Sequence, residues 1–502
     1  MVATLSVGMW EALEPSSSGI LCGRYFNGPC PYASPVMPSL PLPEPWPKLK
    51  RKILAEAKPS QREHDEINTY MTGMRGSLEE ALRKDGIDAD VEIHGSVARD
   101  TWLVGQRDID TFIILRRGSG RRDLLRVNEA VKRFVGEGWV EAYAEHPYVK
   151  KEMGGFEVEF IPCFRAEVGR GLISSTDRSP LHTGYLLPRF TDPLRDDIRV
   201  LKAFMRGIGV YGAEIKVGGF SGYLCELLVL AHGSFAALIE AAANWSDHPI
   251  IQLEKGVDPA KFREPLVVVD PVDANRNVAS AVTETVLWTF VVAARAFSKK
   301  PSEGFFTPEA HDASRLEEEL GNRGVDFLFI VIPDEDPPVP DTLWGQLYRT
   351  EKALGRALVE RGFKVFRSAT WSDEAERHIF VYELEAITLP PVVKRVGPPV
   401  RLVKDSEDFL SRYIGSPDLV SGPWIEGAKW WVEVRRRNAF TREHLREALV
   451  NGYEELGVPK RLADLLGKGG GVYVNLEITP ELRGEFPRFL EGFLRGRPDW
   501  LG

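Results

Sequence analysis

Hydrophobic positions first recur at helical spacing in a segment that begins at Ser60. The sequence Ser60-Gln-Arg-Glu63 fits a capping box, in which a serine and a glutamate side chain cap each other's backbone amides. We expect a helix from there to about Arg83, because an apolar stripe follows at Ile67, Met71, Met74, Leu78 and Leu82. A small mixed sheet with flanking helices should follow, because short apolar stretches bounded by turns occur at 90–94, 109–115 and 156–161.

Longer helical patterns dominate the middle of the chain, at 196–205, 221–232 and 279–297. The last third returns to mixed structure and predicts a β-α-β-β module, with a strand at 325–332, a helix at about 342–361, and strands near Val365 and at 378–385. The pattern therefore predicts an α+β protein of several domains, which we divide at 47–190, 191–304 and 305–502.

Residues 1–46 differ from the rest in composition. They are rich in Pro, Gly and Ser, which indicates an extension without a core of its own. The net charge of −9 argues against a protein that coats nucleic acid through bulk basicity, although basic residues can still gather on one face. The four cysteines are too few and too scattered for a disulfide framework or a four-cysteine zinc site. Without an apolar run of about twenty residues or a signal peptide, we expect a soluble, cytoplasmic protein.

Two aspartates stand out in the predicted strand at 109–115. Asp108 and Asp110 are two residues apart, so the alternation of a strand points both carboxylates to one face. Two converging carboxylates repel each other, and Mg²⁺, which takes one or two carboxylates, is the usual remedy. A lone Asp-x-Asp is weak support, because composition alone would produce about one or two in a chain of this length.

The neighbouring segments strengthen the case. Gly95-Ser96 ends a strand where a short helix begins, so free backbone amides, the Ser96 hydroxyl and Arg99 can meet an anion. The predicted strand at 156–161 alternates apolar residues with Glu157 and Glu159, which places both glutamates on one face. Alone, that strand would be interpreted as having a solvated acidic face. Beside the other two, it completes a two-metal site for phosphoryl transfer.

These segments resemble the polymerase-β-like nucleotidyltransferases, and more closely the archaeal-type, class I CCA-adding enzymes, or tRNA nucleotidyltransferases. The similarity runs from about Ser60 to the C-terminus, through the matching segments GSVARDTWLVGQRDID (95–110), DRSPLHTGY (177–185), LKAFMRGIGVYGAE (201–214), GFSGYLCELL (219–228), DPVDANRNVA (270–279) and LWGQL (343–347). The resemblance implies a catalytic head at 47–190, a helical neck at 191–304, and an α/β body and tail at 305–502 that bind tRNA. The extension at 1–46 has no counterpart.

The resemblance also implies a role for individual residues. Asp108 and Asp110 would ligate two Mg²⁺ ions, and Glu159 would ligate the ion that activates the primer hydroxyl, although the family usually has aspartate at this third position. The implied nucleotide-binding residues are Ser96 and Arg99 on the triphosphate, His182, Lys202 and Tyr211 around the nucleotide, and Arg276 at the base edge, where it helps to select C or A.

The implied reaction is the template-independent addition of CCA to the 3′ end of tRNA, in maturation and repair, from CTP and ATP with release of pyrophosphate. The alternatives are another enzyme of the superfamily, such as a poly(A) polymerase or an oligoadenylate-type synthase, or a catalytically silent RNA-binding relative. The expected partners are tRNA and the two nucleotides, without a membrane, and a homodimer stays an open alternative.

A basic and aromatic segment near residue 430 is a candidate for RNA contact. Trp430 and Trp431 precede Arg435, Arg436 and Arg437, a combination suited to backbone contact or base stacking. The competing interpretation, nearly as strong, is that the tryptophans belong to a core and the arginines to a solvated strand edge.

Overall fold

The fold is described from a computed structural model at residues 42–116, 119–143, 145–167, 172–255, 258–307, 315–436 and 456–501. Its first sheet has five strands in the order β1-β2-β5-β4-β3, with β2 and β5 parallel and the other pairs antiparallel. The strands are β1 (Ala89–Ile93), β2 (Asp108–Leu115), β3 (Val140–Tyr143), β4 (Pro147–Met153) and β5 (Phe156–Phe164). This arrangement confirms the small mixed sheet that the sequence predicts.

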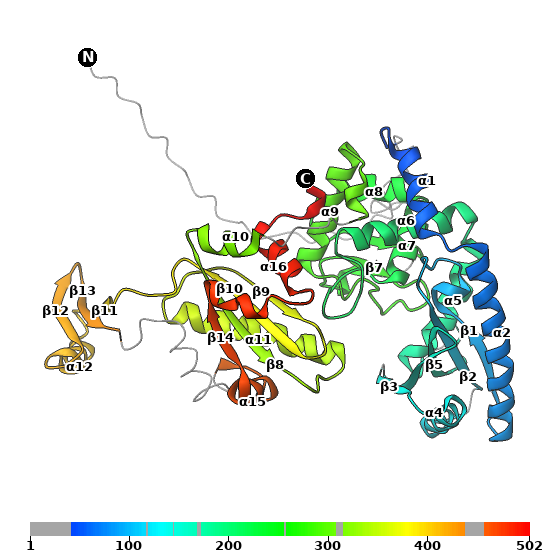
Figure 1. Cartoon of the computed structure of the whole chain (residues 1–502), viewed down its shortest axis with the longest axis horizontal. Coiled ribbons are helices and arrows are strands. Elements are labelled where there is room, and N and C mark those ends of the chain that lie inside the picture. Colours follow the sequence, from blue (N-terminus) through cyan, green and yellow to red (C-terminus); the bar gives the residue numbers. More distant parts are fainter. Residues whose placement is uncertain are drawn as a thin grey trace, which may run out of the picture. The chain divides into compact units, whose positions relative to one another are not determined.

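Two helices, α2 (Gln61–Lys84) and α4 (Arg121–Val135), pack on one face of this sheet (Figure 1). The capping box is present at the start of α2, where Ser60 and Glu63 cap each other. Leu78 and Leu82 of α2 pack with Ile109, Ile113 and other apolar side chains of the sheet, so the expected stripe is the buried one. The opposite face carries polar residues at the start of β2 and β5 and, further along the same strands, a small apolar cluster of Phe112, Ile114, Ile161 and Cys163.

The middle of the chain is helical, as expected. Its helices are α5 (Arg178–Leu186), α6 (Asp192–Gly207), α7 (Gly222–His232), α8 (Phe235–Ala243) and α9 (Glu284–Lys299), with a short parallel pair of strands, β6 (Ile250–Gln252) and β7 (Val267–Val269). The helix predicted at 279–297 begins later, at Glu284, because the Thr283 hydroxyl caps it there. Within the described residues no single helix could span a membrane; only the pair α7 and α8 together has the required length and composition, and it is bent by 90°.

A helix that the sequence did not predict, α1 (Trp46–Ala57), packs against this helical core. Leu42 and Trp46 are both buried there, and the Trp46 ring lies 5.0 Å from the ring of Phe235. Both residues fall in the stretch whose composition indicated no core. The expectation that the first element begins at Ser60 was therefore wrong. The prolines on both sides of Trp46 indicated a coil, but proline is tolerated in the first turn of a helix, and α1 begins there.

The C-terminal third contains a four-stranded antiparallel sheet in the order β14-β8-β10-β9. Its strands are β8 (Asp326–Pro333), β9 (Val365–Ser372), β10 (Arg377–Leu384) and β14 (Gly471–Val474). Helices α11 (Pro340–Glu360) and α15 (Lys460–Gly469) cover one face, and α10 (Leu316–Asn322) and α16 (Phe486–Arg495) cover the other. The β-α-β-β order predicted for this region is confirmed by β8, α11, β9 and β10.

A separate three-stranded antiparallel sheet follows in the chain, in the order β11-β13-β12. Its strands are β11 (Val392–Pro399), β12 (Leu419–Glu426) and β13 (Lys429–Arg435), and helix α12 (Val403–Tyr413) contacts both β11 and β12. The mixture of these sheets and helices confirms the α+β, multidomain class.

Candidate active site

The carboxylates singled out in the sequence share one face of the five-stranded sheet. Strands β2 and β5 are parallel neighbours, and their register places Asp108 beside Glu157 and Asp110 beside Glu159. The residues between them, such as Ile109 and Val158, are fully buried on the opposite face under α2 and α4. The period-two alternation therefore gathers four carboxylates where the sheet is not covered by these helices.

The carboxylates on this face repel one another, and burial adds to the cost of their negative charge. Burial, followed by the negative charge of Glu159, raises the pKa of Asp110 to about 7. Burial and then Glu157 raise the pKa of Asp108 in the same direction. Asp110 and Asp108 thus lie in an environment that favours a cation.

One lysine already supplies part of that positive charge. Lys150 of β4 lies 2.6 Å from Glu157 and 2.8 Å from Glu159, nitrogen to oxygen. Although burial alone would lower it, the two glutamates together raise the pKa of Lys150. Lys150 was not predicted, but its alternation in β4 places it opposite Glu159, a signal that needs the strand pairing to be known.

The turn at Gly95 is built around Asp110. Gly95 begins the short helix α3 (Gly95–Ala98) with φ of +70°, and a Cβ placed on it would lie 1.6 Å from the Asp110 carboxylate. Only glycine fits there, because any side chain would displace the carboxylate. The backbone amide of His94 also donates to the Asp110 carbonyl at 2.9 Å. Ser96, the next residue, is therefore held close to Asp110 by the backbone.

This site suits a hard cation in its chemistry. In the part of the chain that the structure describes, no three acidic, histidine or cysteine side chains are arranged to hold a metal ion as they lie. The donors on the face are nevertheless carboxylate oxygens, the ligands that Mg²⁺ takes, and the Gly95 turn leaves room for the Asp110 carboxylate. After burial, the negative charges of Glu159 and Asp108 also raise the pKa of Asp110, and a cation would offset those charges.

Two of the predicted nucleotide-binding residues, Arg99 for the triphosphate and Lys202 around the nucleotide, surround a buried carboxylate. Arg99 donates to Glu226 of α7 at 2.9 Å and to the Thr183 hydroxyl at 3.1 Å. Lys202 of α6 donates to the Thr101 carbonyl at 2.8 Å and lies 3.6 Å from Glu226.

The carboxylate at the centre of this cluster was missed by sequence reasoning. Burial raises the pKa of Glu226, but Arg99 and Lys202 outweigh it and hold that pKa below its usual value. The available signal is a glutamate in an otherwise apolar helix, Gly222–His232, where a charge needs a partner.

A second buried carboxylate joins two more of the predicted residues. The Asp270 carboxylate lies 2.9 Å from the His182 ring and accepts from Arg276 at 2.8 Å. Burial raises its pKa, but the hydrogen bonds from His182 and Arg276 outweigh burial and hold the pKa of Asp270 at about 2. The His182 ring also stacks on Tyr223, with the ring centroids 3.9 Å apart. Sequence reasoning found His182 and Arg276 but not Asp270, which fixes both.

Tyr211, the last predicted nucleotide residue, lies beside Lys202 at the start of α7. A Cβ placed on Gly222 would lie 3.1 Å from the Tyr211 hydroxyl and 3.6 Å from the Lys202 ammonium. Arg206 lies over the Tyr211 ring at 5.1 Å. The positive charge of Arg206 also opposes the rise in the pKa of Asp108 that burial and Glu157 cause. Arg206 therefore contacts Tyr211 and acts electrostatically on the carboxylate face.

The basic and aromatic segment lies on β13. Trp430 and Trp431 are half-buried, and Lys394 lies 4.4 Å above the Trp431 ring. Arg435 is exposed at the end of the strand, Arg436 donates to the Arg361 carbonyl at 3.2 Å, and Arg437 lies outside the described residues. Neither tryptophan is part of a closed core, and only Arg435 has the exposure of a solvated edge.

Three family models match consecutive parts of the chain: a nucleotidyltransferase domain at 75–182, the second domain of tRNA nucleotidyltransferase at 196–307, and the C-terminal domain of CCA-adding enzyme at 323–473. The CCA-adding enzyme of Pyrobaculum neutrophilum is 40% identical over 407 residues, which cover 80% of this chain and 94% of the relative. The chain belongs to the CCA-adding enzyme family.

Other relatives agree with this assignment. The CCA-adding enzyme of Methanothermobacter thermautotrophicus is 37% identical over 450 residues, or 88% of this chain and 97% of the relative. A solved structure of E. coli MS115-1 CdnC with ATP covers 52% of this chain and 93% of its own, at 17% identity and a TM-score of 0.42, too distant to bear on the site. The expected family and the assignment as a nucleotidyltransferase are confirmed.

Proposed function

We propose that this CCA-adding enzyme family member adds C, C and A to the 3′ end of tRNA from CTP and ATP without a template, with release of pyrophosphate. The observation that carries the proposal is the register of β2 and β5, which places Asp108 and Asp110 beside Glu157 and Glu159 next to the Gly95 turn. Residues 47–190 would be the catalytic head, 191–304 the neck, and 305–502 the tRNA-binding body and tail.

The carboxylate face would hold two magnesium ions. Asp108 and Asp110 would ligate both, and Glu159 would ligate the ion nearer the primer. When bound, these ions would supply Lewis-acid chemistry that lowers the pKa of the RNA 3′-hydroxyl and stabilises the departing pyrophosphate. Lys150 pairs with Glu157 and Glu159, so it would share their carboxylate oxygens with a bound magnesium ion.

The remaining residues would bind and orient the nucleotide. Ser96, held beside Asp110 by the Gly95 turn, would donate its hydroxyl to the triphosphate. Arg99 and Lys202 together exceed the single charge of Glu226, so their cluster presents a net positive field to the phosphates. Tyr211 lies beside the Lys202 ammonium and would close the same side of the nucleotide.

Base selection would depend on Arg276. The Arg276 side chain is one-third exposed while the Asp270 side chain is fully buried, so one edge of the guanidinium would reach a base while the other stays fixed on Asp270. Without a template strand, C and A must be distinguished by such hydrogen bonds to the Watson–Crick edge. Asp270 would orient Arg276 for this purpose.

The third carboxylate gives the sharpest test of the site. Glu159→Gln keeps the shape and removes the charge beside Asp110, and we expect single-turnover C addition to fall by about a hundredfold or more. Glu157→Gln is the matched control from the same face and strand; Glu157 is 51% exposed against 21% for Glu159, so its loss should cost little. Nucleotide binding should survive in both variants.

The opposite result would reassign the ligand. If Glu157→Gln is inactive and Glu159→Gln is active, the third carboxylate is Glu157. If both retain full activity, neither glutamate belongs to the reaction centre.

The location and assembly are further parts of the proposal. We place the protein in the cytoplasm, where tRNA is matured and repaired, and a homodimer remains the assembly to test by sedimentation against a monomer of 56.3 kDa.

A further inference from the structure

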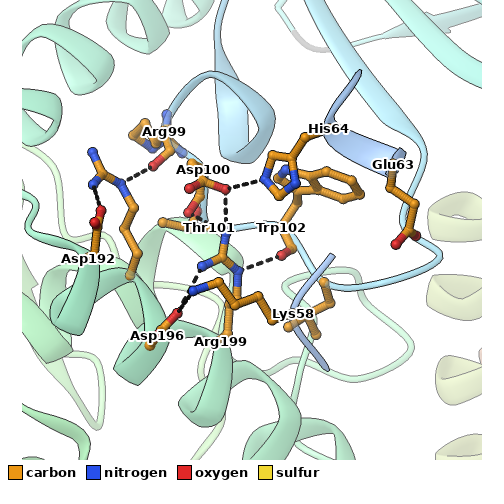
Figure 2. A network of polar contacts seen from close by, with 12 residues as sticks. Lys58, Glu63, His64, Arg99, Asp100, Thr101, Trp102, Asp192, Asp196 and Arg199 are labelled. Carbon is orange, nitrogen blue, oxygen red and sulfur yellow. Dashed lines mark hydrogen bonds and ion pairs between the residues drawn. The ribbon is translucent and has the colours of Figure 1, made fainter. Parts of the chain in front are cut away.

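One face of α6 holds the four residues that follow the Gly95 turn. Arg195 donates to the Arg99 carbonyl at 3.2 Å, and Lys202 donates to the Thr101 carbonyl at 2.8 Å. Between them, Arg199 donates to the carbonyls of Asp100 at 2.8 Å and Trp102 at 3.1 Å (Figure 2). The three cations are spaced by four and three residues, so they share one side of the helix.

Arg199 is the central member of this set. Its side chain is 1% exposed, and it also forms ion pairs with the carboxylates of Asp100 and Asp196. Asp100 adopts a left-handed backbone with φ of +51°, which residues other than glycine rarely take. The Asp100 carboxylate is contacted from the other side by the His64 ring of α2 at 3.0 Å. Arg199 and His64 together thus hold a backbone conformation that the chain would not adopt readily by itself.

Backbone hydrogen bonds join residues 99–102 directly to the Gly95-Ser96 turn. The backbone amide of Thr101 donates to the Ser96 carbonyl at 2.9 Å, and the amide of Asp100 donates to the Val97 carbonyl at 3.1 Å. A change in the path of 99–102 would therefore move Ser96 relative to the Asp110 carboxylate, which is already in tight contact with Gly95. The distance between phosphate donors and metal ligands depends on this segment.

We propose that Arg199 is a positioning residue for the nucleotide, acting through the carbonyls of Asp100 and Trp102 to fix the Gly95-Ser96 turn against Asp110. This inference rests on the proposed function, because it assumes that the turn binds the triphosphate. Arg199 itself is too deeply buried to touch the nucleotide. Its effect is transmitted by the backbone of four residues, each of which is held from α6.

The test compares Arg199→Met with Arg377→Met, which removes a buried arginine of similar chemistry elsewhere in the chain. Arg377 of β10 is also buried and donates to two carbonyls, those of Glu481 at 3.0 Å and Arg483 at 2.7 Å. The equilibrium Kd for CTP with magnesium, and the melting temperature, would be measured for the full chain. We expect both variants to melt earlier, but only Arg199→Met to raise the Kd for CTP, on the order of tenfold.

A milder variant keeps the test decisive if Arg199→Met fails to fold. Arg199→Lys retains the charge, but a single ammonium cannot reach both carbonyls as the forked guanidinium does, so the Kd should rise severalfold. A lower melting temperature with an unchanged Kd, in whichever Arg199 variant folds, would show that Arg199 is only a structural brace and would overturn the inference. A wild-type chain that binds neither CTP nor ATP would instead overturn the proposed function itself.

Discussion

Replacing Glu226 with glutamine removes the only negative charge from the cluster that Arg99, Lys202 and Thr101 form with it among the described residues. Glutamine has nearly the same shape, so the perturbation is electrostatic. Glu226 has no exposed surface, and Arg99 and Lys202 are 8% and 1% exposed in their side chains. The two cations would therefore stay buried without their counter-ion. Burial lowers the pKa of Lys202 against the opposing charge of Glu226, so removing that charge would let the pKa fall further.

The cost follows from the burial of all three groups. Removing one partner of a buried ion pair destabilises a protein by about 3–5 kcal/mol, because the remaining charge is uncompensated. Glu351→Gln is the matched control, since the Glu351 carboxylate accepts from the hydroxyls of Ser368 and Thr370. Glu351→Gln should lower the free energy of unfolding by less than about 2 kcal/mol, because it leaves two neutral hydroxyl donors without a carboxylate and no buried cation without a counter-ion.

Thermal and guanidinium unfolding of the two variants beside the wild type would measure this difference. We expect Glu226→Gln to melt at least ~2 °C below the Glu351→Gln protein. Adding Lys202→Met to Glu226→Gln should recover part of the loss, because it removes one uncompensated cation. If Glu226→Gln melts within about a degree of the wild type, the cluster is not held together by charge.

Three further changes test other parts of the structure. Asp270→Asn should leave CTP binding nearly intact but lower the discrimination between C and A on the order of tenfold, since Arg276 loses the charge that fixes it; competition between the two nucleotides measures this. Asp334→Asn should destabilise the four-stranded sheet, where Asp334 lies 2.8 Å from the buried His378 ring, without changing kcat in the folded enzyme. Calorimetry and a turnover assay measure the two effects, and an unchanged melting temperature with a lower kcat would contradict the prediction. A chain that begins at residue 41 should add nucleotides like the full chain, whereas one that begins after Trp46 should lose ~3 kcal/mol or more of stability in denaturant unfolding, and equal stability of the two would remove α1 from the core.

The parts of the site that depend on local alternation could be predicted from the sequence. Asp108 and Asp110 share a face because strand periodicity is a property of the chain itself, and the same reasoning places Glu157 and Glu159 together. The capping box at Ser60 is equally local. The α+β class and the β-α-β-β order in the C-terminal third also followed from such patterns and were confirmed, whereas the family was expected from the matching segments and confirmed by the relatives.

The parts that depend on distant contacts could not be predicted. Glu226 meets Arg99 across 127 positions, and Asp270 meets His182 across 88. In the sequence Arg199 is an ordinary helix residue, and only the fold brings it to the carbonyls of Asp100 and Trp102, about a hundred positions earlier. Sequence patterns indicated which residues carry charge, but only the fold shows which charges fix the others.

CCA addition itself would be measured with tRNA that lacks its 3′ CCA, incubated with magnesium and each nucleotide in turn and then with CTP and ATP together. We expect two C residues from CTP alone, one A after them when ATP is present, and then no further growth. Long tails of A, or equal incorporation of UTP and GTP, would contradict it.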